Sequence, residues 1–207
     1  DVVSPFLSAG LYYKTFMCPR SFWERIYEPL IRKAAGLGSL SERHDEANYE
    51  KAFAFCDLLV IGAGPAGLTA ALQAARAGAD VILADEGTAM GGRLLSDRTE
   101  IDGKPAAVWV ADVLAELGAL PNVRLMTRTS VTGVYDGGTY GALERVGLHV
   151  PARPDLPREC FWRIVAGQAV LAAGAQERMI AFADNDRPGI MTASSLRTYL
   201  NRFGVVP

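Results

Sequence analysis

The sequence predicts an α/β fold in which a parallel sheet carries an inserted antiparallel β-meander. Two observations lead to this prediction. From residue 57 onward, apolar runs of strand length alternate with longer segments whose apolar residues recur at helical spacing. After residue 129 the strand-like runs lie close together and are separated by turn residues, which is typical of antiparallel strands.

Residues 1–55 precede this pattern and are rich in aromatic side chains. We expect an N-terminal extension that packs on a dinucleotide-binding domain of residues 56–207. Within the extension, residues 21–38 predict a helix that is interrupted near Pro29. The charged stretch 39–53 is interpreted as an exposed connector or a short helix.

The parallel part of the sheet begins with a βαβ unit. Residues 57–61 ("DLLVI") predict a first strand, residues 65–78 a helix with one apolar face, and residues 80–85 ("DVILAD") a second strand. Two strands joined by a helix lie parallel in a sheet that is buried on both faces. We therefore expect both strands in the core.

The later elements follow the same logic. Residues 106–117 predict a helix, residues 123–127 a third parallel strand, and residues 192–204 a capped amphipathic C-terminal helix. The meander is expected from antiparallel strands that are followed by one last buried parallel strand: 130–136, 139–146, 160–165 and then 168–175. The abrupt beginning and end predict a piece of a longer polypeptide, with the domain incomplete at its C-terminal end.

Three glycines between the first strand and the first helix indicate a Rossmann-type dinucleotide site. Gly62, Gly64 and Gly67 form the pattern G-x-G-x-x-G in the context that its mechanism requires. The first glycine allows a tight turn, the second lets the backbone approach a pyrophosphate, and the third allows close packing of helix on strand. Pro65 and Ala66 begin the helix, where unpaired backbone amides attract an anion.

An acidic residue ends the second strand, about twenty residues after the glycines. Asp85 is expected to accept hydrogen bonds from the hydroxyls of the adenosine ribose. Its charge repels a 2′-phosphate and so disfavours NADP, and Glu86 adds to that repulsion. The motif does not separate NAD from FAD, because both present the same ADP half to these residues.

Composition excludes several other functions. The chain has 21 basic and 23 acidic residues, so no positive field favours nucleic acid or an anionic membrane. No apolar run reaches the roughly 18–20 residues of a membrane span, and no secretory signal pattern opens the chain. We expect a cytoplasmic protein with three reduced cysteines, no metal site, and no role for His44 or His149.

Two further features extend the likeness to a known fold. Gly91 and Gly92 follow the acid, and residues 169–175 ("AVLAAGA") end in a turn with Ala173 where threonine is usual. This order of motifs resembles the glutathione-reductase-like fold over residues 56–175. Disulfide reductases of that fold carry a cysteine pair soon after Gly-Gly, whereas residues 93–103 contain no cysteine. Thiol–disulfide chemistry is therefore not expected.

The flanking segments resemble a more specific family. The stretches "GLYYKTFMCP" and "FWERIYEPLIRKAAGLG", with "AAGAQERMIAFADNDRPGIMTASSLRTYLNRFG", are similar to the α subunit of heterotetrameric sarcosine oxidase. Met179 stands where that family tends to have proline. The last block is also similar to subunits of opine oxidase, hydrogen cyanide synthase and amine or proline dehydrogenases.

The resemblance implies a set of nucleotide contacts and no catalytic residue within this chain. The implied pyrophosphate and ribose contacts are the glycine-loop and acid residues named above. Further residues would line the next loop, offer a backbone edge to the adenine and close the late turn: Gly87, Gly92, Arg93 and Leu94 for the loop, Val131 for the adenine and Gly174 for the turn.

The resemblance also implies a complex. NAD would occupy this site, with FAD and FMN elsewhere in an assembly of this α chain with β, γ and δ subunits. Such enzymes oxidise sarcosine to glycine, form peroxide and pass a one-carbon unit to tetrahydrofolate, and this segment alone would be inactive. Two alternatives stay open: FAD in this same site of an amine or amino-acid dehydrogenase subunit, or a nucleotide with only a structural role.

Overall fold

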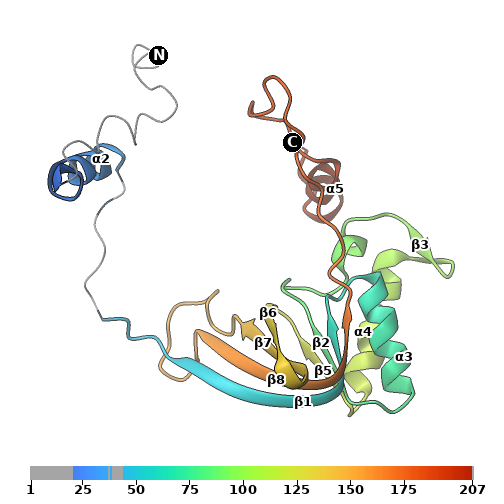
Figure 1. The fold of residues 1–207 in the computed structure, drawn as a ribbon. Helices are drawn as coiled ribbons and strands as arrows, with labels where there is room; N and C mark the ends of the chain where they lie inside the picture. The colour runs from blue at the N-terminus through green and yellow to red at the C-terminus, as the bar shows by residue number, and fades with distance from the viewer. Residues whose placement is uncertain (1–20, 37, 39–43, 207) are drawn as a thin grey trace. The chain divides into compact units, whose positions relative to one another are not determined.

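The computed structural model describes residues 21–36, 38 and 44–206, which form two units that divide after Glu46 (Figure 1). The first unit contains a π-helical segment, η2 (Trp23–Tyr27), followed directly by α2 (Glu28–Ala34). The aromatic residues before position 21 lie outside the described residues. The second unit contains the sheet and every predicted nucleotide contact.

The helix of the first unit continues through Pro29, where an interruption was expected. The backbone N–H of Glu28 donates to the carbonyl of Trp23, five residues earlier, which is a π-helical bond. Proline lacks an N–H, and its ring crowds the carbonyl four residues before it. A wider turn immediately before Pro29 relieves that crowding, so the helix widens instead of ending.

Six strands form one mixed sheet in the order β5-β2-β1-β8-β7-β6. The strands β5, β2, β1 and β8 are parallel, whereas β7 pairs antiparallel with both β8 and β6. This arrangement confirms the predicted combination of parallel sheet and meander. Their bounds are β1 Tyr49–Ile61, β2 Val81–Ala84, β5 Val123–Met126, β6 Thr129–Tyr135, β7 Thr139–Glu144 and β8 Glu159–Leu171.

The strand β8 differs from the expectation of two separate strands. Residues 160–165 and 168–171 belong to one strand, which pairs with β7 on one side and with β1 on the other. Its partner β1 begins at Tyr49, before the expected domain boundary at residue 56, because residues 49–55 pair with residues 159–165. The end of β8 was expected to be buried, yet Leu171 is 77% exposed.

The helices α3 (Pro65–Arg76) and α4 (Ala106–Ala119) cover one face of the parallel strands (Figure 1). Leu68 and Leu72 of α3 meet Val60, Leu83 and Leu117 in a first apolar core. The stretch between β2 and α4 contains a short 3-10 helix and a two-stranded hairpin: η3 Gly92–Leu95, β3 Glu100–Ile101 and β4 Lys104–Pro105.

A second apolar core fills the other face of the sheet. Leu59, Ile82 and Ile164 lie there, with Met126 and Ala142. The sheet curls so that β6 returns to β2, where the backbone N–H of Thr129 donates to the carbonyl of Asp85 at 2.8 Å. The meander strands therefore enclose this core instead of extending the sheet outward.

The C-terminal helix α5 (Ala193–Arg202) begins as predicted. The Thr192 hydroxyl caps it by accepting from the backbone N–H of Ser195 at 3.3 Å. Its apolar residues Leu196, Tyr199 and Leu200 are exposed. Among the residues that the structure describes, no helix combines the length and apolar character needed to cross a membrane.

Candidate dinucleotide-binding site

The first and third glycines of the loop between β1 and α3 are required by packing. Gly62 has a φ of +99°, and a Cβ there would lie 2.5 Å from the carbonyl oxygen of Ala172. A Cβ on Gly67 would lie 1.8 Å from the carbonyl oxygen of Gly62. Both positions therefore exclude any side chain, because the turn after β8 crowds Gly62 and the backbone of Gly62 itself crowds Gly67.

The second glycine is not explained by packing. Gly64 has a φ of −73°, which any residue adopts, and a Cβ built there meets no atom within 4 Å. It precedes α3, whose first residues Pro65 and Ala66 stand where helical N–H groups lack a partner within the helix. The space beside Gly64 therefore fits a group that approaches the backbone closely and carries negative charge.

Asp85 binds two backbone amides. One carboxylate oxygen accepts from the N–H of Ala63 at 2.7 Å, and the other accepts from the N–H of Gly87 at 2.8 Å. These bonds fix the glycine loop relative to the end of β2. An ionised carboxylate has about four lone-pair positions, so two amides leave room for ribose hydroxyls.

The second glycine pair rests against the first loop. The N–H of Gly91 donates to the carbonyl of Ala63 at 2.8 Å. Gly92 has a φ of +54°, and a Cβ there would lie 2.9 Å from the Cα of Gly64. A side chain at position 92 would therefore push into the space beside Gly64, which explains a glycine at this position.

The turn after β8 completes the cluster. The N–H of Ala172 donates to the carbonyl of Ile61 at 2.8 Å, and its own carbonyl lies against Gly62 as described above. Gly174 follows with a φ of +71°. Segments around residues 62, 85, 92 and 172 thus meet at the carboxyl ends of β1, β2 and β8, where ligands of open α/β sheets bind.

The other predicted contact residues differ in burial and in the groups that they contact. The side chain of Leu94 is buried in the first apolar core, and its N–H donates to the carbonyl of Gly91 at 3.1 Å. Val131 pairs with Ala142 and packs on the second core. Glu86 and Arg93 are exposed, and Arg93 Nε donates to Asp97 at 2.8 Å.

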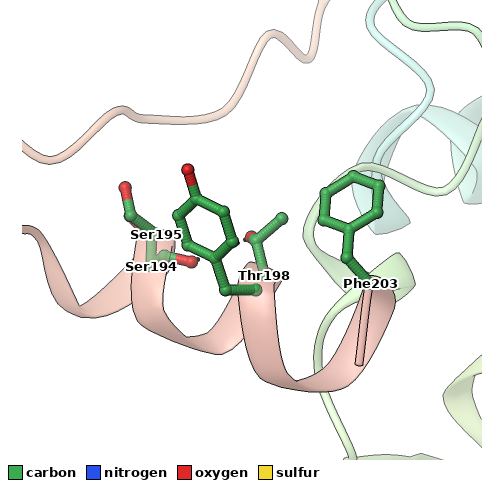
Figure 2. Close-up of a pocket in the computed structure, with 5 residues that line it drawn as sticks. Ser194, Ser195, Thr198 and Phe203 are labelled. Atoms are coloured by element: carbon green, nitrogen blue, oxygen red, sulfur yellow. Dashed lines mark hydrogen bonds between the residues drawn. The ribbon is translucent and has the colours of Figure 1, made fainter. Parts of the chain in front are cut away.

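A cavity lies on α5, and its described lining contains none of the glycine-loop residues. Its volume is about 340 Å³. Figure 2 shows four of its lining side chains along one side of the helix: Ser194, Ser195, Thr198 and Phe203. Tyr199 also lines the cavity. In the first turn of α5, the Ser194 hydroxyl and amide donate to Glu177 at 2.6 and 2.8 Å and lower the pKa of that carboxyl.

The cysteines of the described segments are free thiols. Cys160 is buried and Cys56 is half-buried. Burial raises the pKa of Cys56 to about 11, with smaller contributions that include the charges of Asp57 and Asp80. A thiol with that pKa is almost entirely protonated at neutral pH and is a poor nucleophile.

Comparison with known proteins places the chain in a family. The profile of the pyridine nucleotide-disulphide oxidoreductases matches residues 56–200, which include both glycine loops, Asp85 and most of α5. The chain belongs to this family. The predicted α/β fold of the dinucleotide-binding type is confirmed by this match.

Individual relatives show which members of the pyridine nucleotide-disulphide oxidoreductases this chain resembles. The α subunit of sarcosine oxidase from Rhizobium meliloti (strain 1021) is 59% identical over 100% of this chain and 21% of its own length. An opine oxidase subunit from Agrobacterium tumefaciens (strain Ach5) is 33% identical over 74% of this chain and 30% of its own length. The predicted resemblance to sarcosine oxidase α subunits is confirmed, and the chain spans about a fifth of their length.

One solved structure has a similar fold. L-proline dehydrogenase from P. horikoshii matches with a TM-score of 0.59 and 27% sequence identity. The match covers 80% of this chain and 32% of that chain.

Three residues that support the candidate site were missed by sequence reasoning. Ala63 uses both backbone polar atoms to join the loops, yet it occupies an unspecified position of the glycine motif. Asp97 lies four residues after Arg93, a spacing that can signal an ion pair on a helical turn. Arg145 donates to the carbonyl of Glu86 at 2.8 Å, and nothing in the sequence links these two positions.

Proposed function

We propose that residues 56–207 bind the ADP half of a dinucleotide at the glycine loops. The observation that carries this proposal is the contrast among the three glycines. Packing explains Gly62 and Gly67, whereas Gly64 has open space on its side-chain face. Because Gly64 immediately precedes α3 and lies beside Gly92, this open space suits a ligand that approaches its backbone.

The surrounding residues have separate tasks in this proposal. The first amides of α3, at Ala66 and Gly67, face the diphosphate, while Asp85 accepts from the ribose hydroxyls. Further contacts come from Glu86, Gly87, Gly92, Arg93, the backbone of Leu94, Val131 at the adenine edge, and Gly174. The bound nicotinamide or flavin ring supplies hydride-transfer chemistry. The residues of this chain bind and orient it.

We further propose that the dinucleotide is NAD and that the chain acts within an α subunit of a sarcosine oxidase-like complex. The 59% identity to a sarcosine oxidase α subunit supports this. In this proposal the complex oxidises sarcosine to glycine in the cytoplasm, forms peroxide and transfers a one-carbon unit to tetrahydrofolate. FAD and FMN, with the β, γ and δ subunits and the rest of the α chain, complete the assembly.

A second candidate is an FAD site in an amine or amino-acid dehydrogenase subunit. Its support is the structural likeness to an L-proline dehydrogenase and the sequence likeness to an opine oxidase subunit. NAD and FAD share their ADP half, so the glycine loops suit both.

The nucleotide content of the complete complex tests the assignment. Nucleotides are released by denaturing the purified wild-type complex and a Gly64→Ala complex, then separated and quantified by chromatography. We expect the variant to lose NAD while FAD and FMN stay at their wild-type ratio to protein. A selective loss of FAD would instead assign FAD to this site, and an unchanged content of every nucleotide would contradict binding at Gly64.

A further inference from the structure

Asp97 connects the second glycine loop with α5. Its carboxylate accepts from Arg93 Nε at 2.8 Å and from Arg197 Nη1 at 3.2 Å. The Asp97 side chain is only 4% exposed, whereas the side chains of Arg93 and Arg197 are 69% and 47% exposed. The carboxylate therefore lies beneath the surface, and two guanidinium groups from different elements meet on it.

The bond to Asp97 uses one part of the Arg93 guanidinium. This group is planar and carries five N–H donors in fixed directions. A bond from Nε therefore sets the plane of the group and leaves the Nη donors available to a ligand. Because Arg93 follows Gly92, which lies against Gly64, the oriented group starts beside the space proposed for the diphosphate.

The exposed guanidinium of Arg93 suits an anion. Asp97 faces both guanidinium groups, and the charge of Arg197 also acts on Glu177, so Arg93 is the cation of this cluster that remains available to a diphosphate. Bidentate contacts from arginine to phosphate are stronger than neutral hydrogen bonds. An exposed arginine without a fixed partner would lose more side-chain entropy on binding than one that is already held.

The helix α5 supports this arrangement from a distant part of the sequence. Arg197 shares the Asp97 carboxylate, and Asn201 Nδ2 donates to the carbonyl of Ser96 at 2.7 Å. The loop of residues 92–97 is thus bound at two points by one helix. This anchoring keeps the buried carboxylate in a constant position relative to Gly92.

We propose that Asp97 is a positioning residue of the dinucleotide site: it orients the Arg93 guanidinium toward the diphosphate. This proposal rests on the dinucleotide function proposed above. Asp97 acts through Arg93, so removing Asp97 has consequences for nucleotide binding only while Arg93 is present.

A double-mutant cycle tests this dependence. The probe is ADP, the half shared by NAD and FAD, titrated calorimetrically into the complete natural polypeptide after its bound nucleotide has been removed. We expect Asp97→Asn to weaken ADP binding about fivefold and Arg93→Gln about tenfold, with the double variant no weaker than Arg93→Gln alone. A full additional fivefold loss from Asp97→Asn in the Arg93→Gln background would overturn the proposal.

Two further variants distinguish a specific effect on ADP binding from a general loss of structure. Asp112→Asn removes a carboxylate from an exposed ion pair with Lys104 and should leave ADP affinity at the wild-type value. Arg93→Lys changes only an exposed side chain and keeps the charge, but lysine cannot bind Asp97 and the diphosphate through one rigid plane. We expect it to bind ADP nearly as weakly as Arg93→Gln, and wild-type affinity in this variant would contradict the proposal even if Asp97→Asn did not fold.

The experiment separates failure of this proposal from failure of the dinucleotide function. If the wild type does not bind ADP, both are wrong. If the wild type binds ADP and Gly64→Ala abolishes binding, while Asp97→Asn and Arg93→Lys bind normally, only the role of Asp97 is wrong.

Discussion

At the scale of single residues, the three glycines of the motif lie in different structural environments. Gly62 and Gly67 are fixed by backbone atoms that leave no room for a Cβ, whereas Gly64 faces open space. The same motif therefore combines two positions that the fold requires with one that we propose a ligand approaches. Substituting alanine at each position separates these two requirements.

Gly67→Ala and Gly64→Ala should act on different properties. At position 67 the new Cβ would overlap the carbonyl of Gly62, so we expect a loss of roughly 3 kcal/mol in the free energy of unfolding. At position 64 we expect near-wild-type stability and loss of nucleotide. Chemical denaturation and nucleotide content measure the two effects.

Gly118→Ala is the matched control for this pair. Gly118 lies within α4 and a Cβ there meets no atom within 4 Å, so alanine should keep or slightly raise stability and leave nucleotide content unchanged. A stability loss at position 64 equal to that at position 67 would contradict the assignment of Gly64 to ligand approach.

Sequence reasoning could identify the glycines because their spacing reflects local geometry. It also found Asp85, although not its bonds to Ala63 and Gly87. The contact between Asp97 and Arg197 could not be predicted from the sequence. It joins residues a hundred positions apart, and it depends on the path of the chain after β8. Local motifs are readable from sequence, whereas their supporting contacts depend on the tertiary fold.

At the scale of elements, α5 is held by hydrogen bonds at its start and along its length. Thr192 and Glu177 satisfy amides at its start, and Arg197 and Asn201 bind the loop of residues 92–97 further along. Its amphipathic pattern predicted the helix and its cap correctly. The pattern could not reveal Glu177, because that carboxylate comes from the preceding loop.

Acid should loosen the start of α5. The pKa of Glu177 lies below its ordinary value of 4.5 because the Ser194 hydroxyl and amide donate to the carboxylate. A lowered folded-state pKa gives stabilisation that is present above the unfolded value and is lost as pH falls through the folded value. We therefore expect faster exchange of the Ser194 amide, relative to its intrinsic rate, as pH falls below about 4.5.

Glu177→Gln should remove this pH dependence. Peptide-level hydrogen exchange should show an α5 start that is already less protected at neutral pH and changes little on acidification beyond the intrinsic rate. Glu100→Gln, on β3, keeps the Glu177 cap and should behave like the wild type. Equal acid sensitivity in Glu177→Gln and the wild type would show that another group controls this end of the helix.

At the scale of the whole sheet-containing unit, two apolar cores share the strands β1, β2 and β5. One core lies under α3 and α4, and the other is enclosed by the meander. Strand and helix alternation predicted both layers. The curl that brings β6 back to β2 was not predicted, because it arises from sheet twist and the long-range bond between Thr129 and Asp85.

Ile164→Ala should destabilise this unit as a whole. Ile164 is completely buried in the second core, so we expect a loss of about 2–4 kcal/mol in the free energy of unfolding. Val134→Ala on the exposed side of β6 should change it by less than about 0.5 kcal/mol. Denaturant titration of the complete natural polypeptide measures both, and similar effects at the two sites would contradict the position of this core.

The pairing of β1 with β8 has a consequence for biosynthesis. Tyr49 pairs with Glu159, so the central strand meets this neighbour only after about 110 further residues have been made. At translation rates of about 5–20 residues per second, that interval lasts on the order of 5–20 s. During it, the backbone edge of residues 49–55 that β8 later covers stays unpaired, and it is open to pairing with other strands.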